Sequence, residues 1–130
     1  MSDAAGKTGA VLPTMTPGGR PSLDVQVTVH DSAALLVLVG ELDLDTSRLL
    51  GAVLDDLLKT RREPALARLV VDVAGVTFAD VAGLSPLLHA RAVLVKRKGR
   101  LELRAPGTRV RRLLKVLALE DLLPEPVHAA

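Results

Sequence analysis

Two aliphatic runs, with a helical pattern between them, set the strongest limit on how this chain folds. Residues Leu35–Val39 are all apolar, and Leu69–Val73 are apolar except at one position, as expected of strands covered on both faces. Between the runs, leucine and valine recur on one helical face from Leu49 to Leu58. A strand, a helix and a strand in this order form a right-handed parallel crossover. The chain is therefore predicted to have an α/β fold around a parallel pair of strands.

Four further elements complete the predicted fold. Leu23–Val29 alternates apolar and polar residues, which indicates a strand with one wet face, and Asp31–Ala34 suits a hairpin to the next strand. A second helix follows Asp80, a last strand spans Leu101–Leu103, and a third helix opens with Thr108 as its cap. The predicted order is β-β-α-β-α-β-α. It describes a mixed four-stranded β-sheet with helices packed against it and its first two strands antiparallel.

Short polar side chains predict where the first two helices begin. Asp45 or Thr46 can cap the first helix and Asp80 the second, because their oxygens accept free backbone N–H groups. The residues Ala74–Ala79 are predicted to be a loop before the second helix. Ser85–Pro86 also resembles a cap followed by a proline at the first helical position. The second helix is therefore predicted either to begin near this pair or to have a distorted first turn.

The composition predicts one soluble domain with loose ends. The chain has 130 residues, of which 48% are apolar and 25% charged, which suffices for one core and is too apolar for disorder. Residues 1–22 contain four glycines and three prolines and are predicted to be a flexible tail. Residues 23–124 are the predicted domain, and residues 125–130 a loose C-terminal end. The apolar runs are too short for a bilayer and no signal-peptide layout is visible, so we expect a cytoplasmic protein without membrane insertion.

Residue types that carry catalysis or bind metals are scarce. The chain has no cysteine and three scattered histidines, which argues against disulfides, thiolate sites and a histidine-rich metal site. It has no nucleophile elbow, phosphate-binding loop or dinucleotide-binding motif. The aspartates near strand ends lack the adjacent acidic pair and late lysine of a phospho-acceptor domain. We therefore expect no enzyme activity, no metal and no cofactor.

Basic residues gather in the last third of the chain. Between Lys96 and Lys115 there are nine lysines and arginines and a single acid, Glu102. Such a run is compatible with nucleic-acid binding, but most of these residues flank apolar positions, as on a solvated face. The single aromatic residue, Phe78, provides no series of stacking platforms for single strands. Nucleic-acid binding is the less favoured alternative, and no direct contact with DNA or RNA is expected.

Two segments follow predicted strands and are expected on one edge of the sheet. The first is Gly40–Asp43, which reads G-E-L-D and is followed by Thr46. The second is Val70–Leu84, which reads V-V-D-V-A-G-V-T-F-A-D-V-A-G-L and leads into a helix start. With a third piece, Pro106–Leu114 followed by Leu119–Leu123, the sequence resembles the STAS domain, in the form of bacterial anti-sigma-factor antagonists. The resemblance covers about residues 22–124.

The resemblance implies a single STAS-like domain with a non-enzymatic, protein-binding role. Family members dock on an anti-sigma factor that is itself a serine kinase, and docking frees a sigma factor to join RNA polymerase. The kinase reverses this by phosphorylating the serine after the aspartate of the family motif D-S-x-G-L. In this chain Val81 follows Asp80 and Ala82 comes next, so the family phosphosite position has no hydroxyl. The implied function is an antagonist that sequesters an anti-sigma factor and is not switched at Val81.

The missing hydroxyl leaves three interpretations. The chain is a constitutively active antagonist controlled by its abundance, or a STAS scaffold subunit of another complex, such as a lipid transporter or a signalling assembly. In the third interpretation Ser85 is an alternative phosphosite, because it lies four residues beyond Val81 on nearly the same helical face.

The predicted partner-binding residues lie on the shared edge. They are Glu41, Asp43, Thr46, Asp80, Val81, Ala82, Gly83 and Leu84. Val81 and Leu84 are expected to make apolar contacts, while Asp43 and Asp80 are expected to set register through charge. The expected partner is a protein, an anti-sigma factor of the serine-kinase type if the family role holds. The chain itself is expected to be a monomer or a weak dimer.

Overall fold

A computed structural model describes residues 9–12, 23–59 and 64–124 of the chain. Its strands are β2 (Gly9–Leu12), β3 (Leu23–His30), β4 (Ala33–Leu42), β5 (Arg68–Ala79) and β6 (Arg100–Arg104). Its helices are α1 (Leu44–Lys59), α2 (Val81–Lys96) and α3 (Thr108–Val116), followed by the 3-10 helix η1 (Glu120–Leu122). The four strands and three α-helices expected from the sequence are all present, and β2 and η1 are additions.

The strands form one sheet in the order β2-β3-β4-β5-β6. β3 and β4 are antiparallel, whereas β4, β5 and β6 are parallel to one another. The predicted mixed four-stranded sheet with the order β-β-α-β-α-β-α is therefore confirmed. The hairpin between β3 and β4 is tighter than predicted, because His30 already pairs with Ala33 and only Asp31 and Ser32 form the turn. Asp31 has a positive φ of 54°, a conformation that aspartate tolerates better than most residues.

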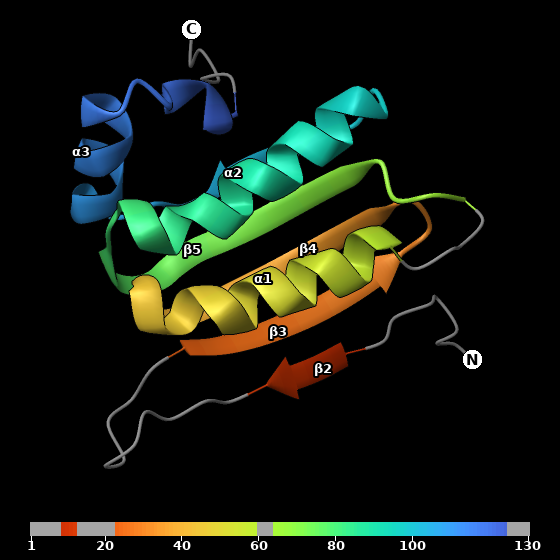
Figure 1. Ribbon diagram of the computed structural model, residues 1–130, viewed down its shortest axis with the longest axis horizontal. Coiled ribbons are helices and arrows are strands. Elements are labelled where there is room, and N and C mark those ends of the chain that lie inside the picture. The colour runs from red at the N-terminus through yellow and green to blue at the C-terminus, as the bar shows by residue number, and fades with distance from the viewer. Residues whose placement is uncertain (1–8, 13–22, 60–63, 125–130) are drawn as a thin grey trace, which may run out of the picture.

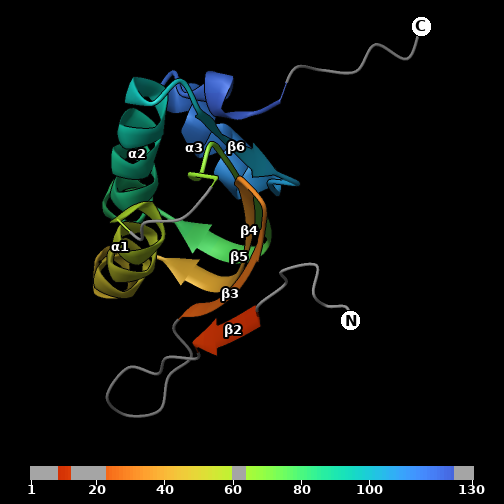
Figure 2. The same ribbon diagram turned by 90° about the vertical axis from the view of Figure 1, so that its right-hand side faces the viewer.

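The helices α1 and α2 lie side by side on one face of the sheet (Figures 1 and 2). Leu36 and Leu38 of β4 point into the layer between sheet and helices and are fully buried. The residues between and beside them, Leu35 and Val37, point to the opposite face and are partly exposed. We call this opposite face, which α1 and α2 leave uncovered, the open face; its central residues are Leu35, Val37 and Val39 of β4, Arg68, Val70 and Asp72 of β5, and Arg100, Glu102 and Arg104 of β6.

The core consists of leucine, valine and alanine. Its largest fully buried side chains are all leucines: Leu23, Leu36, Leu38, Leu42, Leu50, Leu54, Leu69, Leu84, Leu87, Leu94, Leu103 and Leu114. Helix α3 contacts β5 and adds Val110 and Leu114 to the same core. Complete burial of one leucine is worth about 1.5–3 kcal/mol, so this layer is the main favourable contribution to folding. The single aromatic residue, Phe78, is not part of the core.

β5 is longer than predicted, because Ala74–Ala79 continues the strand instead of forming a loop. Its pairing with β4 shifts register twice, between Val37 and Val39 and again between Gly40 and Glu41. Each shift breaks the regular alternation of side chains, as β-bulges do. The interrupted alternation hides the strand from a search for period two, which is why the sequence pattern indicated a loop.

The segment predicted to be a flexible tail contains a strand. Gly9–Leu12 forms β2, which pairs with β3 in the antiparallel direction. Leu12 lies opposite Val25, and Gly9 lies opposite Thr28. An edge strand offers free backbone groups to a neighbouring segment, which gives this short piece its partners. The rest of the predicted tail and the predicted loose end, residues 125–130, lie outside the described residues. The limits of the predicted domain, residues 23–124, remain a prediction.

The cap predicted for the third helix is wrong, and so is one of the two alternatives for the second helix, a start near Ser85. Helix α2 begins at Val81 rather than near Ser85, and Pro86 lies inside it. Since proline has no N–H, the carbonyl of Ala82 lacks its α-helical donor at this point. Helix α3 is preceded by Gly107, which makes no side-chain cap, and the predicted cap Thr108 is instead its first helical residue.

Candidate partner-binding site

The two segments expected on one edge of the sheet are side by side. Glu41 of β4 pairs with Phe78 of β5, and Leu42 pairs with Ala79. Beyond the strands, the N–H of Asp80 donates to the carbonyl of Leu42 at 3.0 Å. Helices α1 and α2 both start at this edge (Figure 1). We call this surface the rim and define it by Glu41, Asp43, Leu44, Phe78, Asp80 and Val81.

Asp43 and Thr46 hold the start of α1 by a reciprocal pair of hydrogen bonds. The N–H of Thr46 donates to Oδ1 of Asp43 at 3.0 Å, and the N–H of Asp43 donates to Oγ1 of Thr46 at 3.0 Å. The Thr46 hydroxyl in turn donates to the carbonyl of Glu41 at 2.8 Å. This is the logic of a capping box, with threonine in the place of the usual glutamate. The cap of α1 is therefore Asp43, and the prediction of Asp45 or Thr46 as the cap is wrong.

Asp80 caps α2, as the sequence predicted. Its Oδ1 accepts the N–H of Gly83 at 2.8 Å, and its carbonyl accepts the N–H of Leu84 at 3.0 Å. A carboxylate at this place also interacts favourably with the positive end of the helix dipole. Asp43 and Asp80 therefore each use one carboxylate oxygen to fix the start of a helix, and the two helix starts lie side by side.

Gly83 allows the two helix starts to approach each other. A Cβ atom built on Gly83 would lie 2.0 Å from the carbonyl carbon and oxygen of Leu42 and 2.5 Å from the N of Asp43. These distances are far below van der Waals contact with backbone atoms that cannot move aside. A side chain at position 83 would therefore push α2 away from the end of β4.

Three apolar side chains project from the rim. Leu44 is 70% exposed, Val81 is 55% exposed and Phe78 is 41% exposed. They come from the first turns of α1 and α2 and from the end of β5. Leu44 and Phe78 are not in the partner-binding set predicted from the sequence. Leu44 precedes the caps predicted for the first helix, and Phe78 lies in the predicted loop. An amphipathic profile starting at Asp43 would have placed Leu44 on the outer face of α1.

Three residues of the predicted partner-binding set are not available to a partner. Thr46 is 2% exposed and occupied by its internal hydrogen bonds, and Gly83 is buried against Leu42. Leu84 is 1% exposed, so the prediction that it makes an apolar contact with a partner is wrong; it packs in the core. Glu41, Asp43, Asp80 and Ala82 are partly exposed at the rim, and Val81 is well exposed. Their role in binding remains a prediction.

A shallow groove of about 500 Å³ runs between α1 and α2 from the rim. Leu44 and Ala82 line its near end, and Ser85 and His89 line it further along α2. Ser85 is exposed, so its hydroxyl is accessible for modification. Whether Ser85 is modified remains a prediction.

The carboxylates of the rim do not form a metal cluster. Within residues 9–12, 23–59 and 64–124, no three His, Asp or Glu side chains lie close enough together to hold a metal ion. No helix of that same part of the chain has the length and apolar character needed to cross a bilayer. The chemistry that the rim offers is therefore apolar contact together with accepted hydrogen bonds and negative charge.

The family model described as "Mlab, STAS domain" matches residues 25–124 of the chain. This is most of the sequence and includes both segments of the rim. A search of curated proteins found no match for the sequence.

Solved structures share the fold. An anti-sigma factor antagonist from Mycobacterium paratuberculosis superposes with a TM-score of 0.67 at 24% identity, over 85% of this chain and 88% of that chain. The anti-sigma factor antagonist SpoIIAA in its unphosphorylated form gives a TM-score of 0.67 at 20% identity, over 80% and 89%. The murine anion transporter Slc26a9 matches 84% of this chain at 13% identity and a TM-score of 0.55, but over only 18% of its own length. The chain therefore belongs to the STAS-domain family and resembles the anti-sigma-factor antagonists within it.

Proposed function

We propose that this STAS domain is a regulatory protein-binding module that captures an anti-sigma factor through the rim. It acts in the cytoplasm, without a catalytic step of its own. The fold of known anti-sigma-factor antagonists supports the class of partner. Val81 has no hydroxyl that a kinase could phosphorylate, which supports an antagonist whose binding is not switched off by phosphorylation at this position.

The observation that carries the proposal is the exposure of Leu44, Phe78 and Val81 on a rigid edge. Two capped helix starts hold these side chains in place, so little conformational entropy is lost when a partner covers them. Aromatic and aliphatic side chains in such a position are typical anchors of protein interfaces. The partly exposed carboxylates of Glu41, Asp43 and Asp80 surround them and supply orientation through charge.

Val81 offers the sharpest test, because α2 also carries a matched control. Val81 is 55% exposed at the rim, and Val95 is 56% exposed near the far end of the same helix. We expect Val81→Asp to weaken binding of a purified anti-sigma factor at least about tenfold, which corresponds to about 1.4 kcal/mol. The free energy of unfolding should change by less than about 1 kcal/mol, because the site is on the surface. Titration calorimetry and urea unfolding measure the two quantities.

Val95→Asp makes the same substitution, valine to aspartate, at a position away from the rim. It should bind the anti-sigma factor like the wild type. If both variants keep their affinity, or both lose it equally, the rim is not the binding site.

Replacing the valine by serine tests the regulatory part of the proposal. Val81→Ser restores a hydroxyl after Asp80, where the positive helix N-terminus accommodates a phosphate. With a kinase-type anti-sigma factor and ATP, we expect this variant to be phosphorylated and then to release the partner, since phosphate adds about −1.5 to −2 charges. The wild type should take up no label. A label on the wild type that Ser85→Ala abolishes would identify Ser85 as the switch instead.

A STAS scaffold role in a transporter or signalling complex is the second candidate. The match to part of the Slc26a9 anion transporter is the observation that favours it. A scaffold would bind its partner through the same rim, so the identity of the bound partner distinguishes the two proposed functions. Affinity capture with the full chain, repeated with Val81→Asp, should recover an anti-sigma factor under the first proposal and a transporter or assembly subunit under the second.

A further inference from the structure

The exposed face of α3 carries positive charge only. Val110 and Leu114 turn inward, and the exposed cations are Arg109, Arg111, Arg112 and Lys115. No acidic residue occurs in the sequence between Glu102 and Glu120. The helix therefore presents charge of one sign, although the net charge of the whole chain is only +2.

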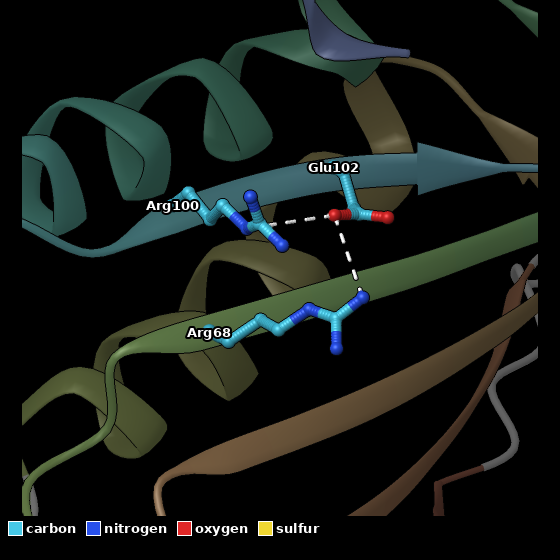
Figure 3. A network of polar contacts seen from close by, with 3 residues as sticks. All are labelled: Arg68, Arg100 and Glu102. Atoms are coloured by element: carbon cyan, nitrogen blue, oxygen red, sulfur yellow. Dashed lines mark ion pairs between the residues drawn. The ribbon is translucent and has the colours of Figure 1, made fainter. Parts of the chain in front are cut away.

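These cations have no partner within the part of the chain that the structure describes. The arginine ion pairs there join Arg68 and Arg100 to Glu102 and Arg91 to Asp121, and none involves α3. On the open face, by contrast, two arginines converge on one carboxylate (Figure 3). The positive charge of α3 is thus available to an external group.

A hollow of about 420 Å³ lies between α3 and η1. Arg111, Arg112 and Lys115 line it, together with Thr108, Leu123 and one carboxylate, Glu120. Three cations against one anion favour a negatively charged occupant. Leu123 adds an apolar wall, which suits a peptide side chain better than a sugar–phosphate backbone.

Helix α3, which forms one wall of the hollow, lies at the same end of the sheet as the rim. α3 and the starts of α1 and α2 are all at one end of the sheet (Figure 1), and α3 contacts β5, which ends at Phe78 and Ala79. The rim is acidic and apolar, whereas the neighbouring face of α3 is basic. Nucleic acid would be repelled by the carboxylates of the rim, while a protein partner can match both signs.

We infer that the basic face of α3 is a second docking surface, which receives an acidic segment of the protein that binds the rim. The inference rests on the proposed function for the identity of that protein, and adds the chemistry of its contact. Opposite charges on exposed surfaces act mainly by accelerating and orienting encounter. The pairing of an acidic rim with a basic helix fixes one orientation of the partner.

The experiment uses a fluorescein-labelled octaglutamate peptide as the probe. Its binding to the full chain is measured by fluorescence anisotropy at low and at physiological salt. We expect Arg111→Glu with Arg112→Glu to weaken binding at least about tenfold and to remove its salt dependence. The control is Lys96→Glu with Arg97→Glu, which makes the same change of charge at the far end of α2, about 22 Å along the helix from Val81. This control should bind the peptide within twofold of the wild type, and thermal unfolding checks that both variants fold.

In the peptide experiment, the inference is overturned by no binding of octaglutamate, by equal loss in the two charge-reversal variants, or by tighter binding of a 20-base-pair duplex than of the peptide. The last result would identify α3 as a nucleic-acid face. Val81→Asp should leave octaglutamate binding within about twofold of the wild type, so this test stands apart from that of the rim. If the anti-sigma factor binds both charge variants equally while Val81→Asp abolishes its binding, the proposed function stands and this inference fails.

Discussion

The rim and the centre of the open face, around Val70, differ in how far their apolar side chains are covered. On the open face, Val70 lies between Leu35 and Glu102 and is almost fully buried, although neither α1 nor α2 covers it. The side chains of Arg68 and Arg100 lie along the sheet toward Glu102, at 3.6 and 3.7 Å from its carboxylate (Figure 3). Long charged side chains cover apolar surface with their stems while their heads stay in water.

At the rim, nothing comparable covers the apolar groups. The carboxylates of Asp43 and Asp80 are short and turn back to cap their helices, so they leave Leu44, Phe78 and Val81 in solvent. On the open face Val70 is covered, although Val39 of the same face is 49% exposed, whereas at the rim three apolar side chains from two neighbouring segments lie in solvent together. An exposed apolar group therefore indicates a binding surface where the polar side chains beside it are engaged in other contacts.

The largest effect is expected from breaking the scaffold of the rim at Gly83. Gly83→Ala places a Cβ atom 2.0 Å from the backbone of Leu42, so α2 must shift. We expect a loss of about 3 kcal/mol in the free energy of unfolding, at the upper end of overpacking, together with loss of partner binding. Urea unfolding measures the first. Gly51→Ala is the control: its Cβ meets only Pro86 at 4.0 Å, and alanine favours a helix by about 1 kcal/mol, so stability should rise.

A smaller effect is expected from Thr46, whose hydrogen bonds join Glu41 and Asp43 within the first segment of the rim. Thr46→Val keeps the shape but leaves the N–H of Asp43 without its acceptor and the carbonyl of Glu41 without its donor. Unsatisfied groups of this kind cost about 1–3 kcal/mol. Ser47, whose hydroxyl donates to Leu44 in an exposed position, serves as the control, and Ser47→Ala should change stability by less than about 0.5 kcal/mol. Equal losses in the two variants would mean that Thr46 does not hold the rim.

The smallest effect is expected on the open face. Glu102→Gln removes the shared anion of Arg68 and Arg100, and exposed ion pairs contribute only about 0–1 kcal/mol. Stability should therefore fall by no more than about 1 kcal/mol, and affinity for the rim's partner should be unchanged. A tenfold loss of affinity in this variant would show that the partner binds the open face.

The sequence pattern was sufficient for the layout of the fold. Regular alternation in β3, continuous apolar runs in β4 and β5, and the helical stripe of α1 predicted the sheet and its parallel centre correctly. These features follow from burial, which repeats along the chain. The predicted strand topology also placed the two segments of the rim on one edge of the sheet.

The surface of the rim was harder to predict, because it depends on irregular geometry. The register shifts in β5 turn Phe78 outward, and no periodic pattern encodes them. Leu84 lies at helical spacing with the buried Leu87 and Leu94, so its burial follows from the periodicity of α2, and its assignment to the partner surface overlooked this. The reciprocal bonds of Asp43 and Thr46 bury a hydroxyl that a sequence pattern places at the surface.

Hydrogen–deuterium exchange of the chain, free and bound to its anti-sigma factor, tests the contrast between the two surfaces most directly. The account predicts slower exchange on binding in residues 41–45 and 78–82, where the rim lies, and no change in residues 68–72 and 100–104 of the open face. Protection confined to the open face, with the rim exchanging as in the free chain, would contradict it.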